Sequence, residues 1–310
     1  MVIYNYTVTG YTSLDELVFG SRSYSIFGGS VIYGSIQASK LCDGVSLITA
    51  IGKNEEKEFV SLLKTYNIEP IKIESYDGKT LSFINEYEND YRIQRVKNRP
   101  NLNINLSSLN FKTKSLHLGP LLDEIKMDID FHEFANLVAL DLQGLIRQEL
   151  EGKIMKKNIT DLYFLSSVDV LKCDWHEFLS LKVGSSFDDV VMKIFDAGPN
   201  ILIITNGDKG SYVITERKAL FVPPYKPSRV VDPTGAGDVY LSSFIITYFN
   251  TNDLGYSALF ASCASSFVIE DLGFSSIADA VKIKRRMKEQ NLKFKELSLT
   301  ELPSYGPARI

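Results

Sequence analysis

The sequence has few of the residues that build disulfide frameworks and metal centres. Among its 310 residues there are three cysteines and three histidines. Cys42, Cys173 and Cys263 are odd in number and far apart, which argues against a disulfide framework and fits a reducing compartment. No HxxH, HExxH or CxxC spacing occurs. A structural zinc site is therefore not expected.

Long hydrophobic runs and an excess of one charge are also missing. No apolar stretch reaches the roughly 18 residues that a membrane-spanning helix needs. The first six residues lack both a basic flank and a long apolar run, so we expect no signal peptide. The 34 basic and 38 acidic residues are interspersed and give a net charge of −4, which indicates no nucleic-acid-binding surface. We expect a soluble, cytoplasmic protein.

Short apolar runs alternate with helical patterns, and 45% of the residues are apolar, which is enough for a packed core. The predicted strands are residues 2–9, 45–51, 115–118, 137–142, 161–166 and 201–205. The predicted helices are residues 30–41, 55–66, 187–197, 239–248 and 254–269. This alternation predicts a mainly parallel sheet covered on both faces, and ligands bind at the carboxyl ends of the strands in such sheets.

Two regions interrupt the alternation. Residues 79–96 alternate apolar and polar side chains around an Asn89-Asp90 turn, which predicts a β-hairpin, and residues 14–25 form short extended segments. Strands without covering helices favour a small lid that excludes water from an active site, with an ordinary edge hairpin as the alternative. We predict one domain over residues 1–310 with lid segments at about 11–25 and 79–100. An exposed lid face would favour a homodimer.

The most informative stretch is Asp-Pro-Thr-Gly-Ala-Gly-Asp at residues 232–238. It follows an apolar run at residues 229–231, which we interpret as the end of a strand. A long apolar segment begins directly after it at Val239. We expect Gly235 and Gly237 to adopt positive φ and to let the backbone approach a ligand closely.

A helix that begins in this loop would direct its free N–H groups and its positive dipole end at an anion, most often a phosphate. Asp238 would then lie beside the anion. A carboxylate does not help to bind phosphate, so Asp238 is better suited to take the proton of an attacking hydroxyl. The pattern indicates phosphoryl transfer to an alcohol, and a glycine-rich turn followed by an acidic helix cap is the alternative.

The same string resembles the C-terminal signature of the PfkB/ribokinase family of carbohydrate and nucleoside kinases. The Gly28-Gly29 pair before a predicted helix is similar to the start of the family's N-terminal signature, and this likeness extends through Gly52. The resemblance covers residues 2 to about 277. It implies a ribokinase-like doubly wound α/β/α sandwich with a small β-sheet lid. It also implies ATP-dependent phosphorylation of a hydroxyl group with Mg²⁺.

The resemblance assigns residues to the donor phosphates. The N–H groups of Gly235, Ala236 and Gly237 would hold the transferring phosphate, and Asp238 would be the base. Arg147, which follows a string similar to the family's Asp-x-Asn, would stabilise the phosphoryl charge, with a surface helix arginine as the alternative.

The resemblance also assigns residues to metals. Asp174-Trp175-His176-Glu177 occupies the place of the family's Asn-x-x-Glu motif, so Glu177 would order the Mg²⁺ shell through water. The same four residues could form a helix capping box, and the two interpretations are compatible. The family often also uses a monovalent cation near the Asp232-Pro233-Thr234 loop.

For the nucleotide, residues 205–210 are similar to the family's Thr-x-Gly-x-x-Gly stretch, although an Asn-Gly hairpin turn would give the same local pattern. Residues 262–273 resemble the segment that lies beside the adenine. The nucleotide-binding residues that the resemblance implies are Asp174, Thr205, Gly207, Gly210, Thr234 and Ser266.

For the acceptor, Asp15 follows the first strand and is similar by position to the family's sugar-hydroxyl-binding Asp, with a solvated loop Asp as the alternative. Tyr33 stands where ribokinase-like members commonly carry Asn, which argues against ribose. Gln143 stands where the family's Asp-x-Asn motif has Asn. The string at residues 141–147 resembles archaeal inositol-kinase-like members of the family. The acceptor-binding residues are then Asp15, Gly28, Gly29, Tyr33, Asn85, Arg92, Gln94 and Gln143.

We therefore expect a kinase for a small sugar or polyol, with myo-inositol as the candidate acceptor. Ribose, fructose phosphate, 2-keto-3-deoxygluconate and nucleosides are alternatives within the same family. A non-catalytic sensor of nucleotides or sugars on the same fold is an alternative of another class. Asp238 and the two glycines count against the sensor, because a sensor has no need of a base.

Overall fold

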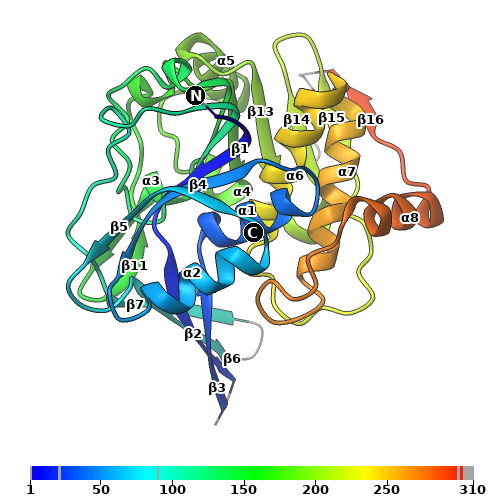
Figure 1. The fold of residues 1–310 in the computed structure, drawn as a ribbon. Coiled ribbons are helices and arrows are strands. Elements are labelled where there is room, and N and C mark those ends of the chain that lie inside the picture. Colours follow the sequence, from blue (N-terminus) through cyan, green and yellow to red (C-terminus); the bar gives the residue numbers. More distant parts are fainter. Residues whose placement is uncertain (1, 20–21, 89–90, 299–300, 303–310) are drawn as a thin grey trace.

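The computed structural model describes residues 2–19, 22–88, 91–298 and 301–302, without the side chains of residues 19, 86–88 and 91–93. Its main sheet has ten strands in the order β16-β15-β14-β13-β12-β9-β8-β1-β4-β5 (Figure 1). The seven strands from β13 to β5 are parallel, and β14, β15 and β16 add an antiparallel edge. The strands are β1 (Ile3–Thr9), β4 (Val45–Gly52), β5 (Glu69–Tyr76), β8 (Lys112–Leu118), β9 (Ala135–Asp141), β12 (Val170–Asp174), β13 (Ile201–Thr205), β14 (Ser211–Ile214), β15 (Ala219–Val222) and β16 (Lys295–Leu297).

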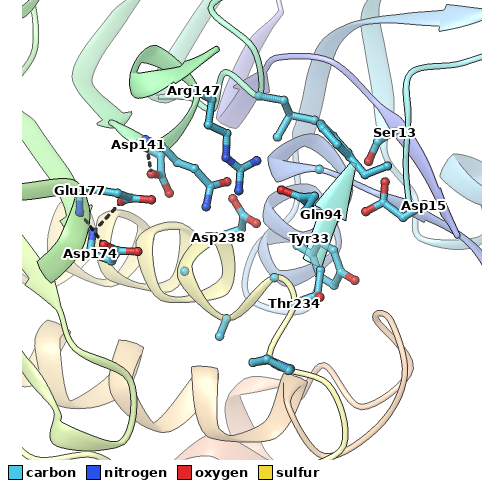
Figure 2. A pocket seen from close by; sticks show the side chains of 18 of the residues that line it. Ser13, Asp15, Tyr33, Gln94, Asp141, Arg147, Asp174, Glu177, Thr234 and Asp238 are labelled. Atoms are coloured by element: carbon cyan, nitrogen blue, oxygen red, sulfur yellow. Dashed lines mark hydrogen bonds between the residues drawn. The ribbon is translucent and has the colours of Figure 1, made fainter. Parts of the chain in front are cut away.

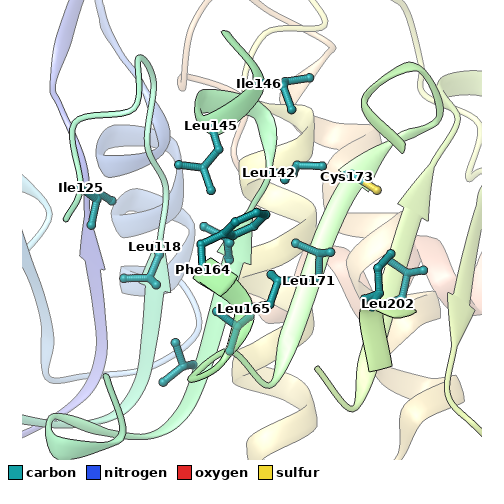
Figure 3. Packing of buried hydrophobic residues seen from close by; sticks show 14 of the residues in the cluster. Leu118, Ile125, Leu142, Leu145, Ile146, Phe164, Leu165, Leu171, Cys173 and Leu202 are labelled. Carbon is teal, nitrogen blue, oxygen red and sulfur yellow. The ribbon is translucent and has the colours of Figure 1, made fainter. Parts of the chain in front are cut away.

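Apolar side chains cover both faces of this sheet because successive strand residues point to opposite sides. In β9, Val138 and Leu140 belong to one hydrophobic cluster, and Ala139 between them belongs to the other. Figure 3 shows the first cluster, in which Leu171 and Leu202 of neighbouring strands lie together. The predicted doubly wound α/β/α sandwich is confirmed.

Helices of eight or more residues cover these faces. They are α1 (Ser30–Ser39), α2 (Glu56–Thr65), α5 (Phe187–Ala197), α6 (Ala236–Thr251), α7 (Leu254–Val268) and α8 (Ala280–Gln290). The shorter ones are α3 (Gln143–Ile146), α4 (Trp175–Phe178) and the 3-10 turns η1 (Phe131–Glu133), η2 (Tyr163–Leu165) and η3 (Gly207–Lys209). Helix α6 is apolar on all sides because it packs against α1, α7 and the sheet together. No helix of the described residues is long and apolar enough to cross a membrane.

A second sheet of six strands has the order β10-β11-β7-β6-β2-β3 and projects from the main body (Figure 1). Its strands are β2 (Ser13–Phe19), β3 (Arg22–Gly28), β6 (Ser82–Glu88), β7 (Tyr91–Asn98), β10 (Arg147–Leu150) and β11 (Lys153–Lys156). The hairpin predicted at residues 79–96 is confirmed in its two antiparallel strands, β6 and β7, and its Asn89-Asp90 turn lies outside the described residues. The β10–β11 hairpin was not predicted from the sequence.

Two predicted strands are wrong. Residues 161–166 contain the 3-10 turn η2, because the Asp161 carboxylate accepts a hydrogen bond from the Tyr163 N–H and closes a turn. The strand of this region is β12, a few residues later. The apolar run at residues 229–231 is not a strand: its Val230 side chain is 68% exposed, and the Val231 N–H donates to a single carbonyl after α7.

Candidate active site

The loop before α6 is built by its own side chains. The carboxylate of Asp232, which is buried, accepts hydrogen bonds from the Thr234 N–H at 3.0 Å and the Thr234 hydroxyl at 2.7 Å. Gly235 follows with φ of 80° and caps α6, whose first residue is Ala236. At the start of α6 the Ala236 N–H donates to the Pro233 carbonyl at 3.3 Å, and the first bond within the helix runs from the Val239 N–H to the Gly235 carbonyl. The N–H groups of Gly237 and Asp238 between them are therefore available to an anion.

The prediction of positive φ holds for Gly235 and is wrong for Gly237, which lies within the helix. Gly237 is needed for space: a Cβ on it would lie 2.6 Å from Nζ of Lys172. A side chain at position 235 would overlap the ring of Tyr33, which packs on the loop from α1.

A cavity of about 330 Å³ lies in front of this loop (Figure 2). It brings together most of the residues predicted for catalysis and acceptor binding, from segments as far apart as β2 and α6. The predicted residues that line it are Asp15, Gly29, Tyr33, Gln94, Gln143, Arg147, Asp174, Glu177, Thr205, Thr234, Gly235, Ala236, Gly237 and Asp238. The cavity therefore lies where the parallel strands end, as expected for such a sheet.

Asp238 lies at the centre of the cavity, between Arg147 and Gln94 (Figure 2). Burial and the neighbouring Asp141 carboxylate raise the pKa of Asp238 from 3.8 to about 6, against the lowering effects of a hydrogen bond from Ser30 and the cations Lys172 and Arg147. A carboxyl group with a pKa near the working pH is well matched to proton transfer. Arg147 begins β10 and lines the cavity, so the alternative of a surface helix arginine is wrong.

Sequence reasoning missed a buried ion pair beneath the loop. Nζ of Lys172 in β12 lies 2.8 Å from Oδ2 of Asp141 at the end of β9, and each side chain is 4% exposed. Burial alone would lower the pKa of Lys172, but the carboxylates of Asp141, Glu177 and Asp238 raise it above its usual range, so the ammonium stays charged. A lysine inside an otherwise apolar strand was the signal that could have identified it.

Asp174 and Glu177 form a reciprocal capping box at α4, which confirms the local interpretation of that motif. The Asp174 carboxylate accepts from the Glu177 N–H at 2.7 Å, and the Glu177 carboxylate accepts from the Asp174 N–H at 2.6 Å. Burial raises the pKa of Glu177 to about 7, and Lys172 opposes this effect. Both carboxyl groups also line the cavity.

The carboxylate oxygens of Asp174 and Glu177 are too few to hold Mg²⁺ without further ligands. The described residues contain no group of three or more carboxylate, histidine or cysteine side chains placed to hold a metal. Mg²⁺ keeps several waters and is usually bound through one or two carboxylates together with substrate phosphates. Glu177 and Asp174 would suit that mode, with the rest of the shell supplied by phosphate and water.

The second sheet closes the other side of the cavity. Asp15 of β2 is buried, and Gly28 makes room for it, because a Cβ on Gly28 would lie 2.9 Å from Oδ2 of Asp15. Nε2 of Gln94 donates to Oδ1 of Asn85 at 2.9 Å, so the fully buried Asn85 supports Gln94 from behind rather than lining the cavity. The Arg92 side chain lies outside the described residues.

A second cavity of about 510 Å³ adjoins the first, and the two share Thr205, Pro233, Ala236 and Gly237. Its walls include Tyr225, Val230 and Ile269, together with four predicted nucleotide residues, Thr205, Gly207, Gly210 and Ser266. The residues at 205–210 do form the predicted hairpin connection, through η3 between β13 and β14. This second cavity lies at the N-terminal end of α6, next to the loop at residues 232–235, which we call the anion loop.

The fold and site define a ribokinase-like α/β protein. A pyrophosphate-dependent kinase of the ribokinase family, solved with a pyrophosphate analogue and myo-inositol, superimposes with a TM-score of 0.74 over 93% of this chain and 100% of that chain, at 19% identity. A model of the pfkB family carbohydrate kinases matches residues 6–280. The chain therefore belongs to the PfkB carbohydrate kinase family and is a phosphotransferase that acts on hydroxyl groups of sugars or nucleosides.

Two curated relatives differ in their acceptors. A nucleoside kinase of Methanocaldococcus jannaschii is 30% identical over 172 residues, which are 54% of this chain and 53% of that protein. An inositol 3-kinase of Arabidopsis thaliana is 27% identical over 173 residues, 52% of this chain and 45% of that protein. The chain thus matches about half the length of each of these relatives, and their names do not agree on one acceptor class.

Proposed function

We propose that this enzyme transfers the γ-phosphoryl group of ATP to a hydroxyl of a small polyol, with myo-inositol as the leading acceptor. The observation that carries the proposal is the position of Asp238. This carboxyl group lies between the anion loop of α6 and the polar residues of the second sheet. A hydroxyl held there would face a base on one side and a phosphate on the other.

In the proposed step, Asp238 accepts the hydroxyl proton as the acceptor oxygen forms its bond to the γ-phosphorus. The bond from that phosphorus to the bridging oxygen breaks, and ADP leaves with the electron pair. The N–H groups of Gly235 and Gly237 would stabilise the charge on the transferring group, and the N–H of Ala236 would join them on leaving the Pro233 carbonyl. Bound Mg²⁺ would offset the negative charge of the donor phosphates. Arg147 and Lys172 place two further cations at the same cavity.

The apolar cavity beside the loop supports a nucleotide donor rather than bare pyrophosphate. Its walls include Tyr225, Val230 and Ile269, and it joins the phosphate end through Pro233 and Ala236. A base and ribose would bury apolar surface there, whereas pyrophosphate would leave that space to water. The structural relative that uses pyrophosphate makes the choice of donor a necessary test.

The acceptor side supports a polyol because polar side chains converge on it. Asp15, Ser13 and Gln94 line the cavity there. A buried carboxylate can accept hydrogen bonds from two neighbouring hydroxyls, and a site built in this way penalises analogues that lack them. Tyr33 and Phe83 favour a nucleoside as the second candidate, because their rings also line the cavity and could stack on a base.

One matrix of assays tests all of these points. Purified enzyme is given ATP or pyrophosphate with myo-inositol, ribose, fructose 6-phosphate, 2-keto-3-deoxygluconate or cytidine, and each phosphorylated product is quantified. We expect ATP with myo-inositol to give the highest kcat/KM. A preference of tenfold or more for cytidine or ribose would overturn the inositol assignment, and equal turnover with pyrophosphate would overturn the ATP assignment. Nucleotide binding without transfer to any acceptor would favour the sensor.

A further inference from the structure

One wall of the second cavity is a segment without helix or strand. Residues 223–230, which we call the strap, run from the end of β15 toward the anion loop. The strap residues that line the 510 Å³ cavity are Pro224, Tyr225, Lys226, Pro227 and Val230. Lys226 and Pro227 also line a separate groove of about 650 Å³, so the strap lies between two hollows. Its position therefore depends on the polar groups that bind its backbone.

Two side chains from later in the chain bind N–H groups of the strap. Gln290, the last residue of α8, accepts from the Lys226 N–H at 2.9 Å and donates to the Lys226 carbonyl at 2.8 Å. Oε1 of Glu270, just after α7, accepts from the Ser228 N–H at 2.6 Å. Pro227 between them has no N–H to donate. The strap is thus held at two points, one on α8 and one at the end of α7.

Arg286 of α8 holds the Glu270 carboxylate in place. Nη2 of Arg286 lies 2.7 Å from Oε1 of Glu270, and Nη1 donates to the Ser266 hydroxyl at 2.8 Å. Cζ of Arg286 lies 3.4 Å from the centre of the Phe267 ring. The Arg286 and Glu270 side chains are 11% and 16% exposed, so water and salt screen their attraction little. A planar guanidinium with directed donors fixes its partners in one geometry.

These contacts join two walls of the second cavity. Ser266 in α7 and Ile269 directly after it line one wall, and the strap lines another. Arg286 binds Ser266 itself and holds the strap through Glu270 and the Ser228 N–H. One arginine that does not line the cavity therefore links α7 to the strap.

We propose that Arg286 is a positioning residue for the nucleotide donor: it holds the strap against α7 and so fixes the width of the cavity that receives the base and ribose. This inference rests on the proposed use of a nucleotide donor. A wall that is in place before the ligand arrives spares the cost of ordering it on binding. Loss of Arg286 should weaken binding of the nucleoside part of the donor alone, because Asp232 and Thr234 hold the anion loop independently.

The first measurement is steady-state kinetics of two neighbouring variants on α8. Arg286→Met removes the guanidinium and keeps an unbranched side chain beside Phe267. Arg285→Met is the matched control, because Arg285 is 70% exposed and its Nε lies 3.9 Å from the nearest carboxylate oxygen, on Glu289. Arg286→Met should raise the ATP KM about 10-fold and leave kcat and the acceptor KM within about twofold of the wild type. Arg285→Met should match the wild type. An unchanged ATP KM in a folded Arg286→Met protein would overturn the proposal.

The second measurement is calorimetric binding, which needs no turnover. Tripolyphosphate has the phosphates of the donor and neither base nor ribose. Arg286→Met should raise the Kd of ATP about 10-fold and leave the Kd of tripolyphosphate unchanged. Equal weakening of both ligands would show general damage to the site and would contradict a positioning role. A wild type that binds ATP no better than tripolyphosphate would instead overturn the ATP donor, and this inference with it.

A double-mutant cycle tests the route through Glu270. Glu270→Gln keeps the shape of the side chain and removes its charge. If Arg286 acts on the strap through this carboxylate, the two substitutions share one interaction, and their effects on the Kd of ATP should be less than additive. Fully additive effects would show that Arg286 does not act through Glu270, which would contradict the proposal.

Discussion

The two sides of the cavity are built in different ways. The α6 side comes from one continuous stretch, residues 232–238, and presents mainly backbone groups of a loop and a helix end. The opposite side is assembled from β2, α1, β6 and β7 and presents side chains, among them Asp15, Tyr33 and Gln94. Backbone groups at a helix end suit any phosphate, whereas the assembled side chains suit one acceptor. Substitutions on the α6 side should therefore lower the rate for every acceptor. Substitutions on the opposite side should change which acceptor is preferred.

The largest effect is expected for Asp238→Asn. It should keep the fold and nucleotide binding and lower kcat by about 10²- to 10⁴-fold, the usual range for loss of a positioned base. The loss should be similar for every acceptor, since it lies in the common step. Asp196→Asn, an exposed change on α5, is the control. Near-normal turnover of a folded Asp238→Asn protein would remove this residue from the mechanism.

A slightly smaller effect, on stability, is expected for Lys172→Met. The variant leaves the buried Asp141 carboxylate without its cation, which typically costs about 3–5 kcal/mol of unfolding free energy. Urea unfolding measures this loss, and Lys193→Met, half-exposed on α5, is the control. Adding Asp141→Leu removes the unpaired charge and should restore most of the stability. If Lys172→Met were as stable as the wild type, the Lys172–Asp141 ion pair would have to be solvated.

The pH dependence tests the electrostatics of the same side. Asp238 must be deprotonated to act, so with its pKa raised to about 6, kcat/KM should fall tenfold per pH unit below pH 6. A raised carboxyl pKa also means that the contribution of Asp238 to stability is present below pH 3.8 and lost as the pH rises through about 6. Asp238→Asn should therefore gain stability relative to the wild type on going from pH 4 to pH 7.5. A rate that stays flat down to pH 4.5 would contradict the assignment.

The smallest effect is expected on the side of the cavity opposite α6, for Gln94→Leu. The variant removes a polar group from the cavity and leaves Oδ1 of the buried Asn85 without its donor. In the proposed function Gln94 also hydrogen-bonds the acceptor, and loss of such a bond is worth about 1 kcal/mol, so the acceptor KM should rise about 3- to 10-fold with the ATP KM unchanged. Gln148→Leu on the exposed face of β10 is the control. Equal rises in both KM values would show that the two sides are not separable.

This division also explains which features could be predicted from the sequence. Helix α5 was predicted with its observed bounds because its start and end signals are local: Ser186 caps its first residue and Gly198 directly follows its last. The anion loop is equally local. Residues 161–166 were mispredicted because an apolar run does not reveal the turn that Asp161 closes.

The missed features depend on residues far apart in the sequence. Lys172 and Asp141 are 31 positions apart and meet only because β9 and β12 are neighbours. The β10–β11 hairpin is short and half of its strand residues are charged, so it carries little of the apolar alternation that identifies a strand.

The contact between Tyr33 and Gly235 has a consequence for how this enzyme can evolve or be redesigned. The Tyr33 ring fills the space that a side chain at position 235 would need, and the φ of 80° at Gly235 disfavours other residues as well. Position 33 is then the only member of the pair that can vary. Smaller side chains at position 33 would enlarge the cavity next to the loop at residues 232–235. A library of variants at this one position could therefore be screened for new acceptors while the residues that bind the donor stay unchanged.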